Sequence, residues 1–185
     1  IGFVAQAVDA WPTIHFRGYE IGLFSPWERI SVKEAFQKYT HVSMTEALNR
    51  DLFDEVMVQE IEPKLGIRKP TFLYDYPAER GALARLKKTD PGVAERFEFY
   101  MGGLELANGF SELVDSKEQR KRFHVENENR QSLGKRIYSV PDKFLAELDN
   151  MPPSAGIALG VDRLVMVFLD AKTIDEVVAF TPEEL

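Results

Sequence analysis

Four polar residues between positions 98 and 112 have side chains that suit the binding of a cation together with phosphate groups. Glu98, Glu105, Asn108 and Glu112 stand among Phe and Gly residues, and carboxylates in apolar surroundings are costly to bury without partners. A divalent cation and nucleotide phosphates would supply such partners, because Mg²⁺ is commonly held by one or two carboxylates and substrate phosphates. A third carboxylate could pair with an ammonium ligand. On spacing alone, a solvated polar face of a sheet is the simpler interpretation.

A second group of residues lies in the segment GIALGVDR, residues 156–163. Gly156 and Gly160 would let a ligand approach the backbone closely. Asp162 and Arg163 fall in the first turn of an expected helix, and a guanidinium there suits a phosphate or a stacked base. A cation in the first turn is mildly unfavourable for the helix dipole, which favours a functional reason for its position. An ordinary strand–turn–helix remains the alternative.

The first group needs a hairpin to position it, and the second needs a strand followed by a helix. The alternation in 96–101 and 104–113, with a Gly-Gly turn between them, predicts a β-hairpin. A glycine-containing strand within 152–160 and an apolar helix over 161–169 would position Arg163.

The remaining elements complete an α+β fold. Ser31 and Glu34 form a capping-box pattern, and Ser43 and Thr45 are both candidate caps for the next helix. Alternating β-type residues mark 17–24, residues 71–76 are an expected strand, and 79–90 an expected loop. Further helices are expected over 1–10, 31–39, 45–50, 51–65, 116–131 with a capping Ser116, 141–150, and from a capping box at Thr173.

Composition limits the classes of function. With 185 residues, 44% of them hydrophobic, the chain can bury one sizeable core, so we expect one domain. The net charge of −7 argues against a dedicated nucleic-acid surface. The absence of cysteine excludes disulfides, thiolate metal sites and cysteine nucleophiles. No signal peptide or long apolar run is visible, so we expect a cytoplasmic protein without a membrane partner.

Three segments resemble one known family. GIALGVDRLVM resembles motif 3 of the class II aminoacyl-tRNA synthetases, whose Arg contacts ATP. FEFYMGGLELANGFSEL and KPTFLYDYPAERGALA resemble the lysine branch of that class. The resemblance covers residues 27–180 and implies an antiparallel sheet flanked by helices.

Within the family, the chain looks most like the lysyl-tRNA-synthetase paralogues that attach β-lysine to elongation factor P. Ala107 and Ala158 stand where the synthetases usually carry Gly, and the chain ends close to the family's domain boundary at Phe180. Ala158 adds a methyl group to a strand expected to line the amino-acid pocket, which would disfavour α-lysine.

The resemblance implies ATP and Mg²⁺ as cofactors. Glu98 and Glu105 would hold Mg²⁺ and the phosphates of ATP, and Leu106 would lie against the nucleotide. Gly160 would let ATP approach, and Arg163 would stabilise charge developing on the triphosphate. Arg163 and Glu105 are therefore the expected catalytic residues.

The resemblance also implies the substrates. Asn108 would orient lysine or β-lysine, Glu112 would take its amino group, and Ala158 would shape the pocket. The adenylate would then be transferred to a lysine side chain of elongation factor P. Two alternatives stay open: a fragment of a lysyl-tRNA synthetase that charges lysine tRNA, and a non-catalytic synthetase-like binding module.

Residues 1–185 are expected to form the C-terminal portion of such a catalytic domain. Motif 3 is included, whereas motifs 1 and 2 are absent from the sequence, and with them the Arg that grips the α-phosphate. We therefore expect the isolated polypeptide to be unable to form an adenylate. The intact protein is expected to be a homodimer, as is usual in this class.

Overall fold

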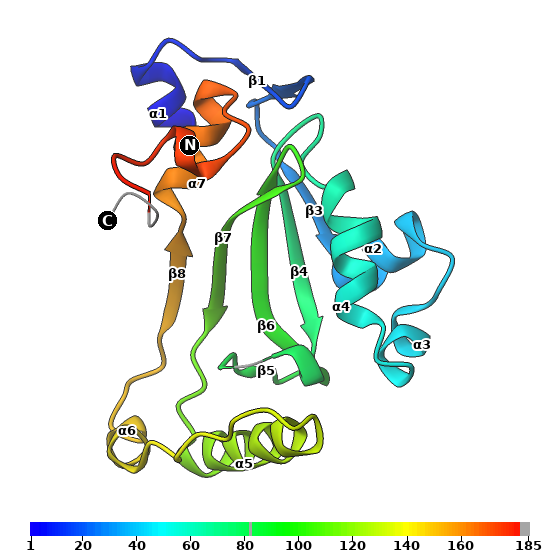
Figure 1. Cartoon of the computed structure of the whole chain (residues 1–185), viewed down its shortest axis with the longest axis vertical. Helices are drawn as coiled ribbons and strands as arrows, with labels where there is room; N and C mark the ends of the chain where they lie inside the picture. The colour runs from blue at the N-terminus through cyan, green and yellow to red at the C-terminus, as the bar shows by residue number, and fades with distance from the viewer. Residues whose placement is uncertain (82, 182–185) are drawn as a thin grey trace. The chain divides into compact units, whose positions relative to one another are not determined.

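The computed structural model of the chain describes residues 1–81 and 83–181, and these form two compact units (Figure 1). The first unit comprises Ile1–Tyr76, Phe97–Gly109 and Ile157–Leu185, and the second comprises Pro77–Arg96 and Phe110–Gly156. The expected assignment of residues 1–185 to the C-terminal portion of one catalytic domain stays a prediction.

The described strands form a two-stranded sheet and a six-stranded sheet. In the larger one the order is β3-β4-β6-β7-β8, with β5 paired to β6. Their bounds are β3 Glu28–Ser31, β4 Thr71–Pro77, β5 Leu86–Lys87, β6 Asp90–Met101, β7 Leu104–Ser111 and β8 Ala155–Leu159. This mixture of helices and strands confirms the α+β prediction. Not every pairing is antiparallel, however, because β3 runs parallel to β4.

The β6–β7 hairpin is confirmed, including its turn. Gly102 and Gly103 have φ values of 58° and 72°, as a two-residue hairpin turn with left-handed central residues requires. The loop predicted over 79–90 is wrong in part, since β5 lies within it and β6 begins at Asp90. That stretch is polar and pairs at the sheet edge, so it lacks the apolar alternation that marks a half-buried strand. Ala82 lies outside the described residues.

Strand β4 changes phase near its end. Thr71 and Leu73 are buried, and the next buried side chain is Tyr76, not the residue at position 75. Asp75 lies between, with a left-handed φ of 59°, a conformation that Asp tolerates better than most residues. One irregular residue therefore turns Tyr76 to the face that Leu73 occupies.

Helices α2 and α4 lie beside β3 and β4 in the first unit (Figure 1). Helix α2 (Val32–Tyr39) has the capping box predicted at Ser31 and Glu34. The single helix expected over 51–65 is wrong: α4 (Phe53–Val56) passes into a π-helix (Met57–Ile61) and a 3₁₀ turn (Glu62–Lys64). Pro63 has no N–H for an α-helical bond, which favours the change. The buried side chains of this layer include Phe36, Phe53 and Ile61.

A second core cluster lies between the N-terminal hairpin and helix α7. Helix α1 (Gly2–Ala7) precedes β1 (Thr13–Phe16) and β2 (Tyr19–Gly22). Arg17 stands in their turn with a φ of 52°, so the strand predicted to begin there is corrected to two strands. Helix α7 (Val161–Leu169) has the predicted bounds, and the Thr173 capping box precedes η4 (Ile174–Glu176).

The second unit contains α5 (Ser116–Ser132), α6 (Asp142–Leu148) and η3 (Ala78–Arg80). Asp115, not the predicted Ser116, caps α5, because its carboxylate accepts bonds from the N–H groups of Lys117 and Glu118. Helices α5 and α6 pack together, with Phe123 against Phe144. None of the described helices has the length and apolar character needed to cross a membrane.

Candidate functional site

Glu98 of β6 is a buried carboxylate with hydrogen-bond donors on both oxygens. Its exposed fraction is 7%. Oε2 accepts bonds from the hydroxyls of Tyr76, at 2.5 Å, and Tyr100, at 2.6 Å. Oε1 accepts a bond from Nδ2 of Asn108 at 3.1 Å. Short bonds to a charged acceptor offset the cost of removing it from water.

Tyr100 keeps its proton in this setting. Burial raises the pKa of its hydroxyl, and the neighbouring Tyr76 and Glu98 raise that pKa further. The hydroxyl therefore remains a donor to Glu98 over the whole physiological range of pH.

Glu105 and Arg163 meet at the N-terminal end of α7. Nη1 of Arg163 donates to the backbone carbonyl of Glu105 at 2.9 Å and lies 3.4 Å from its Oε2. The side chains of Arg163 and Glu105 are 47% and 34% exposed, respectively. A pair this long and this exposed is weak, and the shorter contact of Arg163 is the one with the backbone carbonyl.

Glu62, in the 3₁₀ turn before Gly66, is a further carboxylate near the same residues. Partial burial raises its pKa, and the charges of Glu98 and Glu105 add to the rise; a hydrogen bond with Tyr100 and the charge of Arg163 oppose it. The first unit thus gathers three carboxylates around the Tyr100 hydroxyl and the guanidinium.

Sequence reasoning missed Glu62, Tyr76 and Tyr100. Tyr100 could have been found, because residues i and i+2 of a strand share a face, and it follows Glu98 at that spacing. Glu62 and Tyr76 approach Glu98 through the tertiary fold, which no local pattern reveals.

The predicted nucleotide-binding residues Leu106 and Gly160 are in contact. The N–H of Gly160 donates to the carbonyl of Leu106 at 2.8 Å. The side chain of Leu106 is 1% exposed and packs in the core, so a contact with nucleotide would come from its main chain. A Cβ at Gly160 would have only ordinary contacts of 3.6 Å with Arg163 and Leu106. The protein itself does not require glycine there, and the approach of ATP stays a prediction.

The predicted substrate residues are distributed over both units. Asn108 belongs to the Glu98 network, and Ala158 is exposed on β8. Glu112 lies in the second unit, where its N–H donates to the carbonyl of Ser154 at 2.9 Å. A Cβ at Gly156 would lie 3.0 Å from Oε1 of Glu112. The roles of these residues toward lysine stay predictions.

The donor set of the first unit suits a hard divalent cation. Two hydroxyls occupy Oε2 of Glu98, so a cation would coordinate through Oε1, and the carboxylate of Glu105 is partly open to solvent. Mg²⁺ is commonly bound by one or two carboxylates together with substrate phosphates. Across residues 1–81 and 83–181 no cluster of three or more His, Asp or Glu side chains has the arrangement of a metal site, so the phosphates would have to supply ligands.

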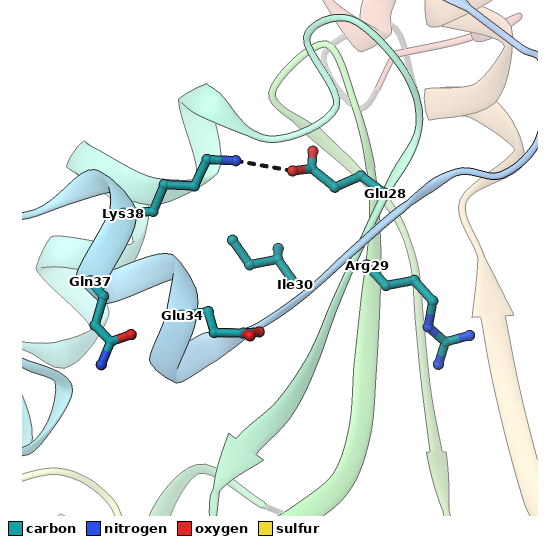
Figure 2. A pocket seen from close by; sticks show the side chains of 6 residues that line it. All are labelled: Glu28, Arg29, Ile30, Glu34, Gln37 and Lys38. Atoms are coloured by element: carbon teal, nitrogen blue, oxygen red, sulfur yellow. Dashed lines mark hydrogen bonds and ion pairs between the residues drawn. The ribbon is translucent and has the colours of Figure 1, made fainter.

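A different pocket, of about 360 Å³, lies where β3 meets α2 in the first unit (Figure 2). Figure 2 shows Lys38 extended toward Glu28, with 3.0 Å between Nζ and Oε1. Burial alone would raise the pKa of Glu28, but hydrogen bonds from Lys38 and Thr71 outweigh it and lower that pKa. Glu34 is engaged in the capping box, and Arg29 lies over Phe72 and Tyr74. Several charged groups of this pocket are thus engaged in contacts within the first unit.

Comparison with known proteins identifies the family. The model of the family described as tRNA synthetases class II (D, K and N) matches residues 7–184. The chain belongs to this family. Its class II sheet accounts for the hairpin that carries Glu98 and Glu105 and for the strand–helix unit that carries Arg163.

Several members of this class II family resemble the chain closely, and each is named elongation factor P–(R)-β-lysine ligase. The protein from Hamiltonella defensa is 43% identical over 159 residues, which cover 84% of this chain and 49% of the relative. The protein from Proteus mirabilis is 47% identical over 134 residues, which cover 71% of this chain and 41% of the relative. The protein from Haemophilus influenzae is 40% identical over 154 residues, which cover 83% of this chain and 48% of the relative. The chain thus spans about half the length of the curated relatives it matches.

Proposed function

We propose that the chain is the C-terminal part of an ATP-dependent ligase that activates lysine or β-lysine and transfers it to a lysine side chain of elongation factor P. The observation that supports this most strongly is the arrangement in the first unit: Arg163 beside Glu105, and Glu98 fixed by three donors. The relatives named as elongation factor P ligases supply the choice of substrate and acceptor.

The proposed chemistry consists of two displacements. A carboxylate oxygen of the amino acid attacks the α-phosphorus of ATP, the bond between the α-phosphorus and its bridging oxygen breaks, and pyrophosphate leaves. The lysine nitrogen of the acceptor then attacks the carbonyl carbon of the adenylate, AMP leaves, and the nitrogen gives up a proton. No protein nucleophile is needed, so catalysis consists of positioning and charge neutralisation.

Each residue has a distinct part in this scheme. Arg163 would leave its weak pairing with Glu105 and bind the triphosphate as negative charge develops on it. Glu98 and Glu105 would hold Mg²⁺, which supplies charge neutralisation of the phosphates when bound. Asn108 and Glu112 would orient the amino acid, and residues outside the chain would complete the site.

Product analysis tests this proposal. The protein, in the complete form that the cell makes, is incubated with ATP and Mg²⁺ and either α-lysine or β-lysine. One set of reactions contains purified elongation factor P, the other contains lysine tRNA, and products are identified by mass. Modified elongation factor P with uncharged tRNA is the expected result. Charged tRNA would make the chain part of a lysyl-tRNA synthetase, and no product in either set would indicate a non-catalytic binding module.

Two matched variants accompany this assay. Arg163→Ala should lower the rate of adenylate formation on the order of 10²–10³-fold, the usual loss for one donor that stabilises transition-state charge. Arg50→Ala also removes an exposed ion pair, that with Glu46, and should leave the rate unchanged. Equal effects of the two substitutions would contradict the role given to Arg163.

Ala158 provides a test of substrate choice. Its side chain projects from the exposed strand β8, and we propose that its methyl group disfavours α-lysine. In the complete protein, Ala158→Gly should raise kcat/KM for α-lysine relative to β-lysine. An unchanged ratio would remove this residue from the account of specificity.

A further inference from the structure

We propose that residues 135–138 of the second unit, together with Arg130 of α5, form a docking surface for an acidic segment of the protein acceptor. The choice of elongation factor P as that acceptor rests on the proposed function. The surface would hold the acceptor in place during transfer.

The charge of this part of the chain is opposite in sign to that of the whole. Residues 116–140 contain seven Lys and Arg against three Asp and Glu, whereas the chain has 23 against 30. A cationic region attracts anionic partners and orients them before contact. A long polyanion such as a nucleic acid would extend past this region and meet the repulsion of a chain with a net charge of −7. A protein that presents a few carboxylates therefore fits the charge distribution better.

The end of α5 turns the chain back along the helix (Figure 1). The N–H of Gly134, whose φ is 63°, donates to the carbonyl of Gln131 at 3.0 Å. The N–H of Lys135 donates to the carbonyl of Arg130 at 2.8 Å. This pair of bonds is the Schellman arrangement of a helix C-terminus. The residues that follow therefore leave the helix in a defined direction.

Two side chains of α5 hold the returning segment. Nε of Arg130 donates to the carbonyl of Arg136 at 2.7 Å. Asn127 binds the backbone of Tyr138 twice: Nδ2 donates to its carbonyl at 2.8 Å, and Oδ1 accepts from its N–H at 3.1 Å. An exposed segment without regular structure is thus ordered before a partner arrives, and a preformed surface lowers the entropic cost of binding.

Two guanidinium groups lie near the ring of Tyr138. Cζ of Arg130 is 4.6 Å from the ring centroid, and Cζ of Arg136 is 5.8 Å from it. A guanidinium beside a ring still presents N–H groups at its edge, and these match a carboxylate bidentately. Glu126 lies 3.8 Å from Nη1 of Arg130, but its side chain is 64% exposed, and such a pair is weak. An acidic ligand would also relieve the repulsion between the two arginines.

A cavity of about 410 Å³ adjoins Arg130 and Tyr138. Its remaining lining residues combine apolar and polar side chains: Phe123, Glu126, Asn127, Ser139, Val140 and Pro141. The neighbouring Ile137 is 55% exposed and Tyr138 is 58% exposed, so a partner would also cover apolar surface. The segment that fits is one in which an apolar residue stands next to an acidic one.

Calorimetric titration of the complete protein with purified elongation factor P, without ATP or lysine, tests the inference. Lys135→Glu combined with Arg136→Glu should raise Kd about 10-fold or more, and it leaves the carbonyl that Arg130 binds in place. Lys33→Glu combined with Lys88→Glu is the control. It reverses two exposed cations elsewhere, changes the net charge equally, and should change Kd by less than about twofold.

Asn127→Ala tests the order of the segment without a change of charge. Because it removes both bonds to the backbone of Tyr138, it should raise Kd roughly 3- to 10-fold. Asn129→Ala, an exposed change on the same helix, is its control and should leave Kd unchanged.

Equal Kd values for the unsubstituted and charge-reversed proteins, equal losses in the two double variants, or no binding by the unsubstituted protein would overturn the inference. It is also wrong if lysine tRNA, titrated in place of elongation factor P, shows the larger loss on charge reversal. Modified elongation factor P in the product analysis together with an insensitive Kd would overturn the docking surface alone. Binding that depends on these cations but yields no product would overturn the proposed ligase activity alone.

Discussion

The carboxylates of Glu98, Glu105 and Glu62 in the first unit have different electrostatic surroundings. Glu98 has hydrogen bonds from uncharged donors, Glu105 has a cation, and Glu62 has a raised pKa. Such divergence among neighbouring acids is common where binding and catalysis occur.

Glu62 should make the stability of the chain depend on pH. Because its pKa is raised above the ordinary value of 4.5 in the folded state, its contribution to stability is complete below that value and is lost as pH rises through the folded pKa. Glu62→Gln removes this loss. The variant should therefore be more stable than the unsubstituted chain near neutral pH, and the difference should shrink toward about pH 4.

Thermal melts across this pH range measure the difference between the two proteins, which cancels the titration of other groups. Glu55→Gln is the control, since Glu55 is an exposed residue of α4 whose carboxylate accepts a bond from Gln59. A difference for Glu62→Gln that does not change with pH would contradict a raised pKa for Glu62.

At the scale of elements, helix α3 (Met44–Asn49) distinguishes between two caps that the sequence allowed. Ser43 is the N-cap, and its hydroxyl accepts a bond from the N–H of Glu46 at 3.2 Å. Ser43→Ala should lower the free energy of unfolding by about 1 kcal/mol. Thr45→Ala, an exposed change inside the helix, should stay within about 0.5 kcal/mol. Urea denaturation measures both, and the reverse order would make Thr45 the cap.

Gly66 follows the 3₁₀ turn of Glu62 and packs against the backbone of β6, the strand that bears Glu98. It has a φ of +70°, and a Cβ there would lie 2.5 Å from the carbonyl oxygen of Tyr100. Gly66→Ala should therefore cost about 3 kcal/mol or more, from left-handed strain plus a backbone clash.

Gly18→Ala measures the cost of a left-handed backbone separately from the cost of a clash. Gly18 has a φ of +77°, yet no atom lies within 4 Å of where its Cβ would be. This substitution should cost about 1 kcal/mol. The difference between the two free energies of unfolding, measured in urea, is the cost of the clash. Equal values would mean that β6 moves aside without resistance.

At the scale of the whole molecule, the isolated chain should not catalyse pyrophosphate exchange. It carries Arg163 but spans about half the length of its curated relatives, and the sequence predicts that it lacks the Arg that grips the α-phosphate. Exchange of labelled pyrophosphate into ATP, with the complete Proteus mirabilis relative assayed in parallel, checks this. A rate near that of the relative would show that these residues suffice.

The sequence predicted those parts of the fold in which local chemistry decides the structure. The Gly-Gly hairpin, the Ser31 capping box and α7 have patterns of residues that admit few alternatives. It failed where long-range pairing decides, because β5 and the start of β6 are polar segments of the sheet edge. It also failed in 51–65, where the local effect of Pro63 on the helix type was underestimated. In the site, Glu98, Glu105 and Arg163 were predicted from residue type; the structure brings Glu105 and Arg163 together, and the roles of all three stay predictions. The hydroxyl of Tyr76 could not be predicted, because it depends on the backbone of another residue.

That residue is Asp75, and its left-handed backbone reverses the alternation of inward and outward side chains within β4. Before Asp75 the buried side chains are those of Thr71 and Leu73, at odd-numbered positions. After Asp75 the buried side chain at position 76 is at an even-numbered position. In a regular strand, Tyr76 would share the inward face of neither Leu73 nor Glu98. A relative with tyrosine at position 76 but a β-branched residue at position 75 would have the same residue without its hydroxyl at the carboxylate of Glu98. Identity at position 76 is therefore meaningful only when it is read together with position 75.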